Sequence, residues 1–181
     1  MKINGEEQNK TGAKSFFSTK TLTTLAILMA MEIVLTRFLS IWAWNIRIGF
    51  GFVPIVIAAM LYGPTAAALL AGVSDVLGAL MFPTGPFFPG FTLTAVLTGL
   101  TFGFLLHKKQ SIVNIVLSVG IVQFILGLLV NTYWISVLYS SPFVPLLTTR
   151  VVQSASLFIV QIVTIRLLAE LPKRFPGRFA A

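Results

Sequence analysis

Asp75 is the residue whose type and setting most suggest chemistry. This carboxylate lies in an apolar, small-residue segment that reads GPTAAALLAGVSDVLGALM from residue 63 to residue 81. A charge inside a hydrophobic segment is energetically expensive, so it predicts a functional site. The loop that follows, residues 83–91, is rich in Pro, Gly and Phe. It offers fixed backbone and aromatic faces that have little freedom to lose on binding. We therefore expect Asp75 and this loop to form part of a binding site.

Other polar side chains in apolar segments fall at a similar depth. A helix rises about 1.5 Å per residue, so positions along each predicted helix give rough depths. Arg37 lies about one turn, and Asp75 about two turns, from the same end of the helical bundle. Asn131, Arg150 and Gln153 fall one to two turns from that end. Polar groups at this depth must face the bundle interior or a watery cavity. The sequence therefore predicts a polar pocket that opens at this end.

A purely structural interpretation of each residue stays open. Asp75 could pair with Arg37 or Arg150 simply to hold two helices together, although one ion pair would not need the amides as well. Glu32, nearer the middle of its segment, is as good a partner for an arginine as a site residue. Arg166 lies four residues before Glu170, a spacing that predicts a local ion pair on one helix.

Composition identifies the class of protein. The chain is 56% hydrophobic and only 10% charged, whereas a soluble domain is typically about 25% charged. These values, with several long apolar runs, predict a polytopic membrane protein. There is no cysteine and one histidine, His107, so we expect no disulfide framework, no cysteine nucleophile and no metal site. Phosphate-binding and nucleophile–base motifs are absent from the sequence as well. We therefore expect no catalysis and no cofactor, but a binding subunit that works with others.

The elements that must position these residues are six transmembrane helices, and the predicted fold class is all-α. The second is short and contains Pro54, which predicts a kink or tilt. The fifth is long and predicted to break near Asn131, and Pro172 is predicted to end the sixth. The predicted helices cover residues 21–41, 48–62, 65–82, 91–106, 111–138 and 144–171.

The basic residues predict the orientation. Nine of the thirteen lie on the side of both termini: Lys2, Lys10, Lys14, Lys20, Lys108, Lys109, Lys173, Arg174 and Arg178. The positive-inside rule then places both termini in the cytoplasm. The predicted organisation is a cytoplasmic tail over residues 1–19, a transmembrane domain over 20–172 and a basic cytoplasmic tail over 173–181. This distribution in a lipid bilayer explains the net charge of +8 without any nucleic-acid partner.

Three stretches resemble one family of transporter subunits. They are the AxxxA pattern of Ala26 and Ala30, RIGFGFVPI from residue 47 to 55, and GVSDVLGALMFPTGPFFPGFTLTAVLTG from residue 72 to 99. The chain is similar to the substrate-binding S-components of energy-coupling factor (ECF) vitamin transporters, most closely to their folate-specific members.

That resemblance implies a function in the bacterial plasma membrane. An S-component captures a vitamin from outside, topples in the membrane and delivers the vitamin inward. It does so docked on a transmembrane coupling subunit, EcfT, that two ATPase subunits, EcfA and EcfA′, drive. The resemblance makes Ala26 and Ala30 the docking surface. It also makes the loop over residues 42–47 and the loop after the third helix the gates of the pocket.

Folate chemistry fits the candidate residues. The 2-amino group and ring N–H of a pterin could both donate to Asp75. The flat ring could stack on an aromatic side chain, and the two carboxylates of the glutamate tail could bind an arginine. The sequence does not choose among the arginines. The remaining candidates for substrate binding are Arg37, Asn45, Arg47, Phe87, Phe88, Asn131, Trp134, Arg150 and Gln153.

Three other functions compete with folate capture. An S-component for another vitamin, such as a pyrimidine precursor or pantothenate, would share the scaffold. An intramembrane enzyme could use Asp75 or Glu32 as acid or base, although paired catalytic carboxylates at fixed spacing are absent. A purely structural subunit would bind no small molecule.

Overall fold

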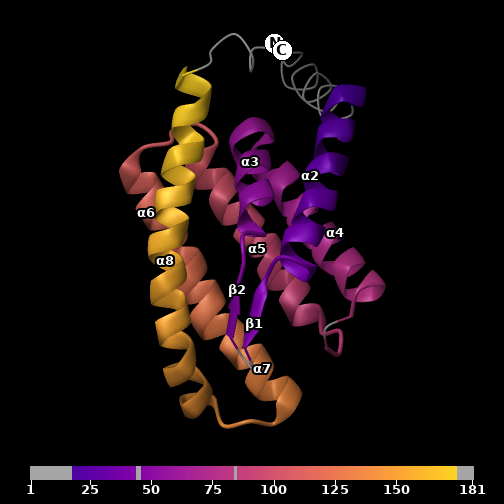
Figure 1. The fold of residues 1–181 in the computed structure, drawn as a ribbon, viewed down its shortest axis with the longest axis vertical. Coiled ribbons are helices and arrows are strands. Elements are labelled where there is room, and N and C mark those ends of the chain that lie inside the picture. The colour runs from indigo at the N-terminus through magenta and orange to yellow at the C-terminus, as the bar shows by residue number, and fades with distance from the viewer. Residues whose placement is uncertain (1–17, 44–45, 84, 175–181) are drawn as a thin grey trace, which may run out of the picture.

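The computed structural model describes residues 18–43, 46–83 and 85–174. These residues form a bundle of helices with one short β-hairpin near one end (Figure 1). The elements, in order, are α2 (Thr19–Arg37), β1 (Ile41–Ala43), β2 (Ile46–Ile48), α3 (Phe52–Tyr62), α4 (Pro64–Met81), α5 (Pro89–Leu106), α6 (Ile112–Gly120), η1 (Ile121–Val130), α7 (Asn131–Tyr139) and α8 (Phe143–Arg174). The helical class is as predicted, and the predicted tails fall largely outside the described residues.

The first loop differs from its prediction. Helix α2 ends at Arg37, four residues before the predicted end. Strands β1 and β2 then pair antiparallel, with Ile41 opposite Ile48 and Ala43 opposite Ile46. This pairing gives hydrogen-bond partners to backbone N–H and C=O groups of the segment. Left unpaired in apolar surroundings, these groups would cost free energy. The hairpin lies against α8 through β2 (Figure 1).

Helix α3 is shorter than predicted because Pro54 lies in its first turn. A proline there leaves no helical hydrogen bond unmade, so it starts the helix instead of kinking it. Pro54 therefore does not kink the helix, and the alternative of a tilt stays a prediction. At the other end, Gly63 adopts a φ of 85°, a conformation that favours glycine. Pro64 follows as the first residue of α4, and the chain turns sharply.

Small residues bring α3, α4 and α5 together in the core. Ala59, Ala66 and Ala67 are fully buried. On α5, a Cβ built on Gly99 would lie 2.7 Å from Cα of Ala68, so α4 and α5 pack with backbones nearly touching. Close approach of this kind is how helices gain van der Waals contact inside a membrane. The result is a closely packed group of three helices.

The fifth predicted helix is continuous but changes type. Residues 112–139 form α6, the π-helix η1 and α7 without interruption. The predicted break near Asn131 is wrong, because the chain instead returns from π-helical to α-helical geometry at that residue. The π-helix is rare in proteins, and those that occur are often found at functional sites. Its wider turn displaces backbone and side chains relative to an α-helix.

Helix α8 runs along the whole side of the bundle (Figure 1). It continues through Pro172 to Arg174, so the predicted stop at Pro172 is wrong. The predicted local ion pair is confirmed, with Nε of Arg166 3.0 Å from Oε1 of Glu170.

Five helical segments of the described chain are long and apolar enough to cross a membrane. They are Thr19–Arg37, Pro64–Met81, Pro89–Leu106, Ile112–Tyr139 and Phe143–Glu170. The shorter helix α3 is also apolar.

Candidate binding site

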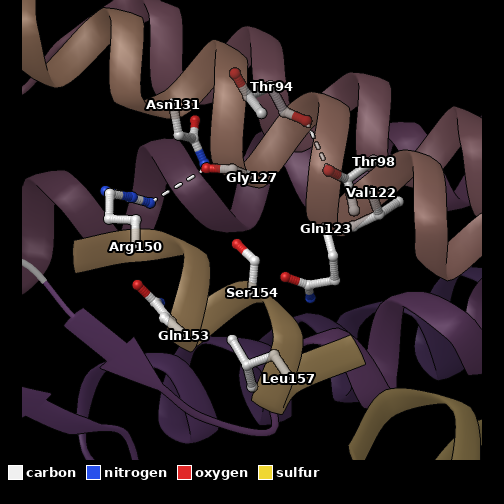
Figure 2. A pocket seen from close by; sticks show the side chains of 10 residues that line it. All are labelled: Thr94, Thr98, Val122, Gln123, Gly127, Asn131, Arg150, Gln153, Ser154 and Leu157. Carbon is white, nitrogen blue, oxygen red and sulfur yellow. Dashed lines mark hydrogen bonds between the residues drawn. The ribbon is translucent and has the colours of Figure 1, made fainter. Parts of the chain in front are cut away.

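A polar cavity of about 230 Å³ lies between α5, the η1–α7 segment and α8. Most of its lining is amide, hydroxyl or guanidinium, which is unusual inside an apolar bundle. Figure 2 shows the ten lining residues: Thr94, Thr98, Val122, Gln123, Gly127, Asn131, Arg150, Gln153, Ser154 and Leu157. Three of the predicted site residues, Asn131, Arg150 and Gln153, thus meet in one cavity.

Arg150 is the charged residue of this lining. Its Nη2 donates a hydrogen bond to the carbonyl oxygen of Gly127 at 3.3 Å (Figure 2). Because Gly127 lies in the π-helical segment, η1 supplies the acceptor that orients this guanidinium. Nε of Arg150 and Oδ1 of Asn131 are buried and have no hydrogen-bond partner among the described residues. Buried polar atoms left unpaired cost about 1–3 kcal/mol each, so the site favours a polar ligand or ordered water.

Two threonines of α5 form the opposite wall. Oγ1 of Thr94 donates to the carbonyl oxygen of Gly90 at 3.0 Å, and Oγ1 of Thr98 donates to that of Thr94 at 2.9 Å. Nε1 of Trp134, on α7, donates to Oγ1 of Thr94 at 3.1 Å. The spacing of four residues puts both hydroxyls on one face of α5.

An aromatic cluster adjoins this wall. The ring of Phe88 lies 5.6 Å from that of Trp134 and 5.9 Å from that of Phe91, measured between centroids. A Cβ on Gly90 would lie 2.5 Å from Cε1 of Phe88 and 2.7 Å from Cδ2 of Trp134, so only glycine lets these rings close over the start of α5. Phe87 is 47% exposed. Phe87, Phe88 and Trp134 are not in the cavity lining.

Asp75 and Arg37 lie apart from the cavity. Oδ2 of Asp75 accepts a hydrogen bond from Oγ1 of Thr92 at 2.7 Å. Thr92 and Thr94 are about 200° apart around α5, so Asp75 contacts the side of α5 away from the cavity wall. The Arg37 guanidinium packs over Gly78, one turn along α4 from Asp75, with Nε 2.9 Å from the position of a Cβ there. Of the expected polar layer, Asn131, Arg150 and Gln153 share this cavity, whereas Asp75 and Arg37 do not line it.

Glu32, Arg47 and Asn45 are the other polar candidates from the sequence. Glu32 is 8% exposed, does not line the cavity, and accepts a hydrogen bond from Oγ1 of Thr36 at 2.7 Å. Arg47 lies on β2, opposite Trp42. Asn45 lies outside the described residues.

Sequence reasoning missed several lining residues. Thr94, Thr98 and Ser154 were missed because hydroxyls are common in apolar helices, where they bond to their own backbone. Gln123 carried a usable signal, because it is an amide in the middle of an apolar run. Gly127 carried no such signal, because the position of its carbonyl group depends on the π-helical geometry.

The long apolar helices and the polar cavity between them indicate the class of membrane-embedded binding proteins. The family model "ECF transporter, substrate-specific component" matches residues 20–174. The chain therefore belongs to the substrate-specific components of ECF transporters, and it is a multi-pass protein of the bacterial cell membrane. This family supplies substrate-binding components of transporters, not enzymes.

Similar proteins narrow the comparison. The folate transporter FolT of Clostridium novyi (strain NT) is 41% identical over 142 residues, which cover 78% of this chain and 83% of that protein. FolT of Leuconostoc mesenteroides is 30% identical over 164 residues, which cover 87% of this chain and 88% of that protein. A crystal structure of FolT bound with folic acid superposes with a TM-score of 0.79 at 28% identity, and the match covers 83% of this chain and 93% of that one.

Proposed function

We propose that this chain captures folate outside the cell and delivers it inward by docking on an ATP-driven energy-coupling module. The observation that carries the proposal is the polar cavity between α5, η1 and α8 on a scaffold similar to FolT bound with folic acid. The relatives named folate transporter FolT support the same substrate.

The proposed topology has six crossings, with α3 as the sixth, and both termini in the cytoplasm. Lys20 lies near the start of α2, and Lys108 and Lys109 lie in the α5–α6 connection. The positive-inside rule assigns that end to the cytoplasm. Arg150 lies seven residues into α8 from Phe143, about 10 Å from the opposite end, so the cavity belongs to the outer half.

The cavity is smaller than the roughly 300–1,000 Å³ of typical ligand pockets. Folate is an elongated molecule, so one end fills the cavity and the remainder extends beyond it. Trp134 adjoins the cavity through its hydrogen bond to Thr94, and Phe88 packs on Trp134, so both offer aromatic faces to that remainder. We assign direct contact inside the cavity to Asn131, Arg150 and Gln153.

The deciding experiment is equilibrium binding of folic acid to the purified chain without partner subunits. Saturable binding of folic acid supports the proposal if neither pantothenate nor a pyrimidine vitamin precursor displaces the bound folic acid. Binding of one of those vitamins in place of folic acid would move the chain to another substrate. Arg150→Met should weaken binding about 100-fold, because the ligand would then face buried amides without the charged donor.

The partners follow from the family. We propose that EcfT receives the exposed face of α2 that carries Ala26 and Ala30, both of which are exposed. Two small residues four apart allow another helix to approach closely. The ATPases EcfA and EcfA′ would then supply the energy.

A further inference from the structure

The carbonyl group of Gly127 lies near the point where η1 returns to the α-helical geometry of α7. At the end of η1 the N–H of Asn131 donates to the carbonyl of Leu126, five residues back. Helix α7 is α-helical from Asn131, and an α-helical N–H donates four residues back, so the next N–H, that of Thr132, belongs to Leu128. The change from five residues to four therefore passes over one carbonyl, that of Gly127.

The donor that this carbonyl lacks within the helix comes from Arg150. Its Nη2 lies 3.3 Å from the carbonyl oxygen of Gly127 and donates to it (Figure 2). A carbonyl without a donor inside an apolar bundle costs free energy, so this hydrogen bond stabilises the π-helical turn as well as the guanidinium. A helix that was α-helical throughout would pair the same carbonyl with the N–H of Asn131. The guanidinium would then share its acceptor with the helix.

Glycine at position 127 leaves room for this geometry. A Cβ there would lie 3.1 Å from the carbonyl oxygen of Val122, which is five residues back and is the acceptor that a π-helical turn offers to the N–H of Gly127. It would also lie 3.6 Å from Oε1 of Gln123, another residue of the cavity lining. The oxygen of Val122 belongs to the backbone, so it cannot move without a change in the π-helical turn. A side chain at position 127 should therefore disturb the turn that presents the carbonyl to Arg150.

We infer that Gly127 is a positioning residue for ligand binding, because the change of helical geometry at the end of η1 frees its carbonyl to hold Arg150 in the cavity. This inference rests on the proposed function, which assigns ligand contact to Arg150. With Nη2 held by Gly127, the guanidinium keeps its other N–H groups for a ligand, and its buried Nε has no partner among the described residues. Preorganisation of this kind raises affinity, because less side-chain freedom is lost on binding.

The first test compares two glycines of the same continuous helix. Gly127→Ala should weaken the binding of folic acid to the purified chain about 10-fold, because the methyl group crowds the turn and moves the acceptor of Arg150. Gly120→Ala should change the affinity by less than about 2-fold, since the nearest atom to its Cβ would be Cε2 of Phe158 at 3.8 Å and both substitutions change helix propensity alike. Equal affinities of the two variants would overturn the inference.

A double-mutant cycle separates positioning from general damage to the fold. If Gly127 acts through Arg150, adding Gly127→Ala to Arg150→Met should weaken folic acid binding by less than about 2-fold further. Losses that multiply in the double variant would give Gly127 a structural role alone and overturn the inference, while the proposed function would stand. If the unmodified chain binds no folic acid, the proposed function itself fails, and a measurement without ligand then decides the positioning.

That measurement is the NMR signal of the Gly127 carbonyl carbon. The sequence has two Gly–Leu pairs, Gly99 with Leu100 and Gly127 with Leu128. A sample with ¹³C-carbonyl glycine and ¹⁵N-leucine therefore gives one carbonyl–amide correlation for each pair, and Leu100→Ile assigns them by removing one. Arg150→Met should move the Gly127 carbon to lower chemical shift, because a donor that polarised its C=O bond is lost, and should leave Gly99 in place. An unmoved Gly127 signal would overturn the inference whether or not folic acid binds.

Discussion

At the scale of single residues, Arg150 and Asp75 lie in different surroundings. Arg150 faces a cavity and bonds a backbone carbonyl, whereas Asp75 bonds a threonine on the other side of α5. Both are ionisable groups inside apolar helices, and Arg150 lines the cavity whereas Asp75 does not.

The first prediction concerns Asp75. Asp75→Asn keeps the shape of the side chain and removes the charge that accepts from Thr92. Because this contact lies away from the cavity, folate affinity should fall less than about 5-fold. Equilibrium binding of folic acid measures this. A loss above about 100-fold would show instead that Asp75 binds the pterin directly.

The second prediction uses two glycines near the aromatic cluster. Gly90→Ala places a methyl group against Phe88 and Trp134 and should destabilise the protein by about 1–3 kcal/mol and weaken folate binding. Gly85→Ala is the control, because its nearest neighbour is the hydroxyl of Tyr139 at 3.4 Å. Thermal unfolding in detergent and folate titration compare the two. Equal behaviour of both variants would show that ring packing at Gly90 is unimportant.

At the scale of elements, the molecule combines a tight pair of helices with a more open group around the cavity. Helices α4 and α5 pack through small residues with almost no space between backbones. On the other side of α5, the η1 and α8 segments stand far enough away to leave the cavity. Helix α5 therefore contributes both to the closely packed pair and to the wall of the cavity.

The third prediction tests this division with two helical glycines. Gly99→Ala should lower the unfolding temperature by several degrees, because its Cβ would meet the backbone of Ala67 and Ala68. Gly120→Ala should leave stability unchanged or raise it by up to about 1 kcal/mol. The nearest atom to its Cβ would be Cε2 of Phe158 at 3.8 Å. Thermal scans of both variants decide it, and a stable Gly99→Ala would argue against close packing.

At the scale of the whole molecule, the cavity and the proposed docking surface lie on different helices. The cavity lies between α5, η1 and α8, whereas Ala26 and Ala30 lie on the exposed side of α2. The two functions should therefore be separable by mutation.

The fourth prediction is that separation. Ala26→Trp or Ala30→Trp should abolish assembly with EcfT and folate uptake while leaving folate binding to the purified chain intact, because the bulk blocks helix approach. Ala155→Trp is the control, since Ala155 is also an exposed alanine but lies on α8. Co-purification, uptake and binding measure the three properties. Joint loss of binding and assembly would argue against separate surfaces.

The sequence by itself determined the class, the approximate helices and three of the cavity residues. Composition required a bilayer, and the rise per residue placed Asn131, Arg150 and Gln153 at one depth. The resemblance in residues 72–99 pointed to folate, which the similar FolT proteins support.

Only the tertiary structure decided which polar groups share a cavity. Depth follows from counting residues, but the direction a side chain faces depends on how each helix is rotated against its neighbours. Asp75 and Thr92 turned to one side of α5 and Thr94 to the other, and the π-helical turns of η1 set the rotation of Gly127 and Asn131. Residues 121–130 are apolar at nearly every position, so their sequence shows no periodicity that would reveal π-helical geometry, and the shape of the site could not be predicted from the chain alone.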